Sequence, residues 1–164
     1  MRASSSLQEA QQRLGVANHL LGRTYPAVND SRILLAVAKE LQQALLDTTN
    51  ALLEQELAAK RIPALVKDPD SRLELLQEAL EHHDSDASYH AAVKEFSDLI
   101  ALHQNSPVEF AKPDRFVICD KDYKVTTVTA DTLKRSLATA RSFIQAVERI
   151  VSEDNARITV QRQS

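Results

Sequence analysis

The fold is decided by one long stretch, residues 31–62, which reads SRILLAVAKELQQALLDTTNALLEQELAAKRI. It contains neither glycine nor proline, and Asp30 or Ser31 can cap its start. It therefore predicts one helix that continues to the break at Pro63, some 30 residues and about 45 Å long. Its apolar residues cover roughly 220° of the circumference, which is too wide for a helix with one neighbour. We expect this helix to lie at the centre of a bundle, packed on more than one side.

Three polar residues interrupt that apolar arc at seven-residue spacing: Gln42, Thr49 and Glu56. They form either a buried polar seam or a solvent-exposed line between two packed neighbours. The exposed line is favoured because an unpaired glutamate is costly to bury.

Four further helices are expected, at about residues 6–21, 68–82, 86–104 and 129–151. The first begins with a capping box formed by Ser6 and Glu9 and stops at Gly22. Asp70 or Ser71 can cap the second of these four helices.

One region has the sequence pattern of β-strands. Residues 115–119 and 124–128 are rich in β-branched and aromatic side chains, and a short charged turn separates them. These segments predict a β-hairpin packed on the bundle. The expected fold is therefore mainly α, an antiparallel bundle of about five helices with one β-hairpin before the last helix. Residues 1–154 are expected to form one domain, and residues 155–164 a frayed tail.

Composition excludes several classes of function. The chain has 164 residues, 43% of them hydrophobic, with a net charge of −3, 2 glycines and 1 cysteine. Two glycines cannot build the glycine-rich loops that bind phosphates, and a single cysteine excludes disulfides and thiolate zinc ribbons. Cys119 is expected to be a small core residue. Without a long apolar run, the sequence predicts a soluble, cytoplasmic protein with no membrane span.

A cluster of histidines and acids suggests a divalent metal site at His82, His83, Asp86 and His90. The alternative is that the histidines favour the negative end of one helix and the aspartate the positive start of the next. The second interpretation is favoured, so no metal ligand, cofactor or catalytic residue is assigned.

The preferred binding surface is a loop held by Pro107 and Pro113 beside the hairpin. It would present four charged residues: Glu109, Lys112, Asp114 and Arg115. The other interpretation, which is slightly favoured, is a structural connector in which Phe110 plugs the bundle.

The last predicted helix carries a basic arc of Lys134, Arg135, Arg141 and Arg149. Such an arc is a solvated face or a contact for RNA phosphates, and Lys134 and Arg141 are its candidate binding residues. RNA would have to avoid residues 64–105, which hold three basic and nine acidic residues, net −6.

Two stretches carry a resemblance to a known family. Residues 19–35 contain HLL, then TYPAVND, then Leu34 and Leu35, and residues 106–119 read SPVEFAKPDRFVIC. They resemble an uncharacterised family of small archaeal helical proteins, whose architecture is similar to HEPN-type bundles. The resemblance implies a helical fold and an archaeal cytoplasm, and no reaction. HEPN nucleases carry an arginine followed four to six residues later by a histidine in a late helix. Arg13 and His19 match that spacing formally, but in the first helix.

The function expected from these features is a non-enzymatic binding or assembly module that self-associates or docks a protein partner. One alternative is a HEPN-like bundle that binds or cleaves RNA. The other is a metal-dependent hydrolase built on the histidine cluster.

Overall fold

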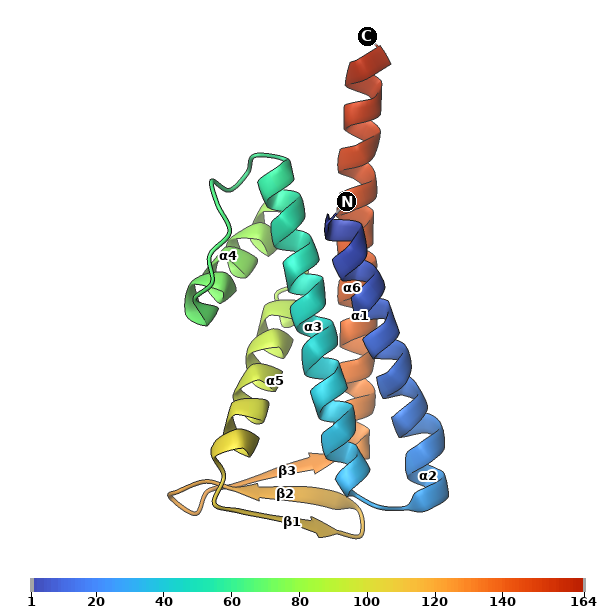
Figure 1. The fold of residues 1–164 in the computed structure, drawn as a ribbon, viewed down its shortest axis with the longest axis vertical. Helices are drawn as coiled ribbons and strands as arrows, with labels where there is room; N and C mark the ends of the chain where they lie inside the picture. The colour runs from blue at the N-terminus through green and yellow to red at the C-terminus, as the bar shows by residue number, and fades with distance from the viewer. Residues whose placement is uncertain (1, 164) are drawn as a thin grey trace.

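The central helix of the fold is α3 (Arg32–Ala58), in a computed structural model that describes residues 2–163. Figure 1 shows α1 (Arg2–His19) and α6 (Ala130–Gln163) packed along α3 on one side, and α5 (Ser88–Asn105) on the other. α4 (Pro69–His82) contacts α3 as well. The prediction of a long helix packed on more than one side is confirmed. Several large apolar side chains of α3 are fully buried, among them Leu34, Leu41, Leu45 and Leu52.

The first helix begins earlier than its capping pattern predicts. α1 starts at Arg2, so Ser6 and Glu9 lie inside the helix and the predicted capping box is wrong. The Ser6 hydroxyl instead lies 3.5 Å from the carboxylate of Glu54 on α3. Ala3, one turn before Ser6, is buried, so apolar packing extends the helix past the expected cap.

Gly22 does not end this helix, and the predicted stop there is wrong. The chain passes through a π-helical turn, η1 (Leu20–Thr24), and continues as α2 (Tyr25–Val28). The end comes at Asn29, whose left-handed conformation (φ 56°) lets its N–H donate to the carbonyl of Tyr25 at 2.8 Å. Asparagine tolerates this conformation better than most residues, and it supplies the C-cap that glycine was expected to give.

α4 is capped by a residue other than the two expected. The carboxylate of Asp68 accepts a hydrogen bond from the backbone N–H of Ser71 at 2.9 Å, and Pro69 occupies the first helical position. Asp70 and Ser71 therefore lie inside the first turn and are not the cap. Proline suits this position because its missing N–H would have no partner there.

The last helix is longer than expected. α6 has 34 residues, about 51 Å, and Figure 1 shows its C-terminal end projecting past the other helices. Beyond Asp154 its side chains are mostly exposed. Fraying of these last turns in solution stays a prediction.

The β-structure is a three-stranded antiparallel sheet at the base of the bundle, in the order β1 (Val108–Lys112), β2 (Arg115–Cys119) and β3 (Val125–Thr129). The predicted hairpin is present as β2 and β3. The irregular loop predicted between Pro107 and Pro113 is wrong, because that segment forms β1. The two prolines flank β1 without interrupting it, so all five of its residues pair with β2.

One face of the sheet closes the base of the bundle. Phe116, Ile118 and Val128 share this face and belong to the hydrophobic core. The mainly α fold class, with strands placed before the last helix, is therefore confirmed, and the β-structure has one strand more than expected.

Candidate functional site

The predicted binding loop is part of the sheet, and its charged residues do not converge. Glu109 lies 2.6 Å from Nδ1 of His103 on α5. The Lys112 ammonium lies 5.8 Å from the ring centroid of Phe110, a cation–π contact within β1. Asp114 occupies the exposed turn between β1 and β2, and Arg115 starts β2.

The basic face of α6 is exposed, as the sequence predicts. Lys134 and Arg141 lie about one and three turns from the start of α6. Neither side chain makes a hydrogen bond or ion pair within residues 2–163. Both are therefore free to meet phosphates, and RNA binding on this face stays a prediction.

The histidine cluster does not assemble as metal ligands would. His83 turns toward α3, and the ring of His82 meets it edge-on with centroids 4.9 Å apart. Asp86 accepts a hydrogen bond from the backbone N–H of Ser88 at 2.8 Å, at the start of α5. Over the described part of the chain, no group of three or more His, Cys, Asp or Glu side chains is arranged to hold a metal ion. The metal-dependent alternative therefore gains no support.

Arg13 and His19 are both exposed on α1. Arg13 Nη1 lies 3.4 Å from Oε2 of Glu40 on α3. A six-residue offset on one helix also turns the two side chains about 120° apart. The HEPN-like alternative stays a prediction without a shared site for this pair.

Four titratable side chains, those of Glu56, Arg61, His83 and Asp154, converge with the amide of Gln55, and we call these five residues the Arg61 cluster. Arg61 Nε and Nη2 donate to the two carboxylate oxygens of Glu56, each at 2.9 Å. Arg61 Nη2 also donates to Asp154 Oδ2 at 2.6 Å, and Nη1 to Oδ1 at 3.3 Å. Nε2 of His83 lies 2.7 Å from Oε1 of Glu56, and Gln55 donates to Asp154 at 2.8 Å.

The cluster corrects the prediction of a solvent-exposed polar line on α3. The side chain of Glu56 is only 3% exposed, and Thr49 is also buried. The hydroxyl of Thr49 donates to the carbonyl of Leu45 at 2.8 Å. Glu56 and Thr49 each have an internal partner, so the burial cost that favoured exposure is offset for these two residues, whereas Gln42 is half-buried.

The electrostatics of the cluster point to a structural role. Burial alone would raise the pKa of Asp154, but hydrogen bonds from Arg61 and Gln55 outweigh it and hold that pKa below its usual range. The hydrogen bond to Asp154 and the contacts with Glu56 raise the pKa of Arg61. Four of the five N–H donors of the Arg61 guanidinium are occupied by Glu56 and Asp154, which leaves one Nη1–H for any further acceptor. The cluster joins the end of α3, the α4–α5 turn and α6.

An exposed apolar surface lies on the side of the sheet that faces away from the bundle. Pairing places five apolar residues on this outer sheet face: Val108, Phe110, Val117, Cys119 and Val125. Val117 is 4% exposed yet stands outside the hydrophobic core, whereas Val108, Phe110 and Val125 are 53%, 40% and 55% exposed. Cys119 is half-buried here, so its predicted place in the core is wrong. The alternation of residues 108–112, apolar at 108 and 110, is the sequence signal for this surface.

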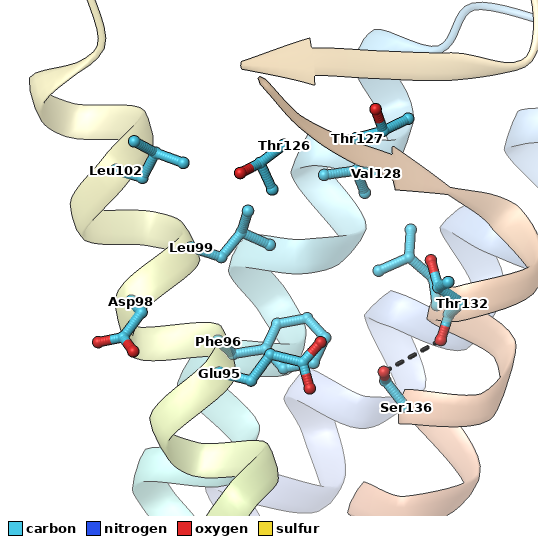
Figure 2. Close-up of a pocket in the computed structure, with 11 residues that line it drawn as sticks. Glu95, Phe96, Asp98, Leu99, Leu102, Thr126, Thr127, Val128, Thr132 and Ser136 are labelled. Carbon is cyan, nitrogen blue, oxygen red and sulfur yellow. Dashed lines mark hydrogen bonds between the residues drawn. The ribbon is translucent and has the colours of Figure 1, made fainter. Parts of the chain in front are cut away.

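A cavity of about 300 Å³ opens between α5, β3 and the first turns of α6, and we call it the α5–β3 cavity. Figure 2 shows α5 on one side, β3 above and α6 opposite. Its apolar lining is Phe96, Leu99, Leu102, Val128 and Leu133. Its polar lining is Glu95, Asp98, Thr126, Thr127, Thr132 and Ser136.

The comparisons with known proteins do not assign the chain to a family. Within residues 2–163, no helix combines the length and apolar character that crossing a bilayer requires. Comparisons with protein-family models, curated proteins and solved structures give no match.

Proposed function

We propose that the protein is a non-enzymatic assembly module that self-associates through β1 and the outer sheet face. The observation that carries the proposal is an edge strand with exposed apolar side chains. β1 is one of the two edge strands of the sheet, so one row of its backbone N–H and C=O groups has no strand partner. Val108 and Phe110 on the same strand are half-exposed beside the shielded Val117.

A second copy of the chain fits this edge by symmetry. Two β1 strands that pair antiparallel with Phe110 opposite its own copy use all five residues of each strand. That register sets Val108 opposite Lys112 and Glu109 opposite Ala111, so no like charges face each other. A shift by two residues would instead set Glu109 against its own copy, which is unfavourable.

The flanking prolines favour a discrete dimer. Pro107 and Pro113 cannot donate backbone hydrogen bonds, so the pairing edge ends after five residues on both sides. Burial of the remaining exposed surface of Val108 and Phe110 would contribute roughly 1 kcal/mol for each side chain. An interface this small is well below the standard size of about 1,600 Å², and we expect weak, concentration-dependent association.

The test is sedimentation equilibrium from about 10 μM to about 1 mM. The wild-type chain should show a reversible monomer–dimer equilibrium. The double variant Val108→Thr, Phe110→Thr keeps β-propensity, and its association should be at least about tenfold weaker. Ile158→Thr is the matched control, because Ile158 is 46% exposed on the projecting end of α6, at the opposite end of the molecule from the sheet. A wild-type monomer at every concentration, or equal association of all three proteins, would overturn the proposal.

A further inference from the structure

We propose that the α5–β3 cavity binds a small amine, protonated and carried on an apolar body, with Glu95 as the group that holds the ammonium. This proposal rests on a different surface from the self-association proposal and does not depend on it. The cavity volume of about 300 Å³ is at the lower end of the range for small-molecule sites.

The charged residues that line the cavity determine whether it attracts a cationic or an anionic ligand. Two carboxylates, Glu95 and Asp98, line the cavity, and no lysine, arginine or histidine is among its lining residues. The surrounding segment of residues 64–105 carries a net charge of −6. Such a field attracts cations and repels anions.

The two carboxylates are not equivalent. Figure 2 shows the Glu95 carboxylate turned across the cavity toward Ser136, whereas Asp98 points away from it. Asp98 accepts a hydrogen bond from Lys94 at 3.0 Å, whereas Glu95 has no hydrogen bond or ion pair among the described residues. Glu95 is therefore the carboxylate available to a ligand.

Hydroxyl groups of α6 complete the acceptor set. Ser136 donates its proton to the carbonyl of Thr132 at 3.0 Å, and the Thr132 hydroxyl donates to the carbonyl of Thr129 at 2.9 Å. The Thr132 oxygen also lies 3.0 Å from the Thr129 hydroxyl, which can donate to it, so the Ser136 oxygen is the one that accepts from no donor among the described residues. An ammonium has three donors and no acceptor, so it matches a carboxylate flanked by such an oxygen.

The apolar lining determines the rest of the ligand. Leu99 and Leu102 are partly buried beside the polar groups and offer a surface to an aromatic or branched aliphatic body, whereas Phe96 and Val128 are themselves buried. A hydrated metal ion would make no favourable contact with these apolar side chains. An amine with an apolar body satisfies both parts of the cavity at once.

The test is a titration of the full, isotope-labelled chain, followed by amide chemical shifts, with three probes of matched shape. The probes are phenethylamine, phenethyl alcohol and phenylacetate. We expect phenethylamine to bind at least about fivefold more tightly than the alcohol, and phenylacetate not to bind. The shifts should fall on residues 95–102, 126–128 and 132–136, the three parts of the lining.

Two variants isolate the role of Glu95. Glu95→Gln should reduce the affinity for phenethylamine to that for the alcohol, and it should fold normally because the side chain is exposed. Asp98→Asn is the matched control on the same helix and should leave the preference for the amine unchanged. The proposal is overturned by any of four results. These are no shifts up to about 10 mM amine, equal affinity for amine and alcohol, an unchanged preference in Glu95→Gln, or shifts outside the cavity.

Discussion

Removal of the Arg61 guanidinium should destabilise the fold far more than removal of a surface arginine that makes an equally short ion pair. In Arg61→Leu, two carboxylates lose their main partner while they remain buried: the side chain of Glu56 is 3% exposed and that of Asp154 is 8% exposed. Removing one partner of a buried ion pair costs about 3–5 kcal/mol, because the remaining charge is left uncompensated. We expect the free energy of unfolding to fall by that amount.

The matched control is Arg32→Leu. The distance from Arg32 Nη2 to Asp30 Oδ2 is 2.6 Å, the same as from Arg61 Nη2 to Asp154 Oδ2. Arg32 is 76% exposed and Arg61 is 21% exposed, so burial is what distinguishes the two pairs. Exposed pairs contribute about 1 kcal/mol or less, so Arg32→Leu should be close to neutral.

The assay is urea unfolding followed by circular dichroism, with the slope of free energy against urea compared among the proteins. A second variant, Glu56→Leu, Arg61→Leu, Asp154→Leu, replaces the charges together and should recover part of the lost stability, since no buried charge is then unpaired. A loss below about 1 kcal/mol in Arg61→Leu, or equal losses in Arg61→Leu and Arg32→Leu, would refute the reasoning.

Two further predictions concern single groups. Ser31 has a hydroxyl that is buried without a hydrogen-bond partner among the described residues, while Asp30 accepts from the first N–H of α3. Ser31→Ala should therefore raise the free energy of unfolding, by about 1 kcal/mol in urea titrations, and a loss typical of a deleted cap would contradict this. The folded-state pKa of Asp154 lies below its unfolded value of about 3.9, so its stabilisation is complete above that pH and declines as pH falls through the folded pKa. Urea titrations should show the stability difference between wild type and Asp154→Asn constant above about pH 5 and shrinking below about pH 4, and a constant difference at all pH values would count against the assignment.

The long central helix was predictable because its signal is local and extended. Residues 31–62 contain no breaker, and their apolar arc is too wide for one contact, so both length and central position follow from periodicity. The hairpin was predictable for a similar reason, because β2 and β3 alternate around a short turn.

The Arg61 cluster was not predictable, because its partners are distant in sequence. Glu56 and Arg61 are close, but Asp154 lies 93 residues beyond Arg61 and His83 lies 27 beyond Glu56. Without those partners, burial of the Glu56 carboxylate only costs free energy. The sequence alone therefore favours a solvent-exposed position for this residue.

β1 was missed because its two prolines indicate a loop when each is considered alone. Pro107 and Pro113 lie at the two ends of the strand, where a missing N–H costs nothing, and the alternation between them is only five residues long. The candidate residues Glu109 and Lys112 were therefore assigned to a loop surface.

The direct join between β3 and α6 has a mechanical consequence. Thr129 ends the strand and Ala130 starts the helix, so no hinge separates them. From Ala130 to Asp154 the helix forms a stiff lever arm of roughly 36 Å. A tilt of the strand by about 5° would swing the far end by about 3 Å, enough to part Asp154 from Arg61. The sheet and the Arg61 cluster are thus joined by one continuous helix of some seven turns, and its packing along α1 and α3 opposes such a tilt.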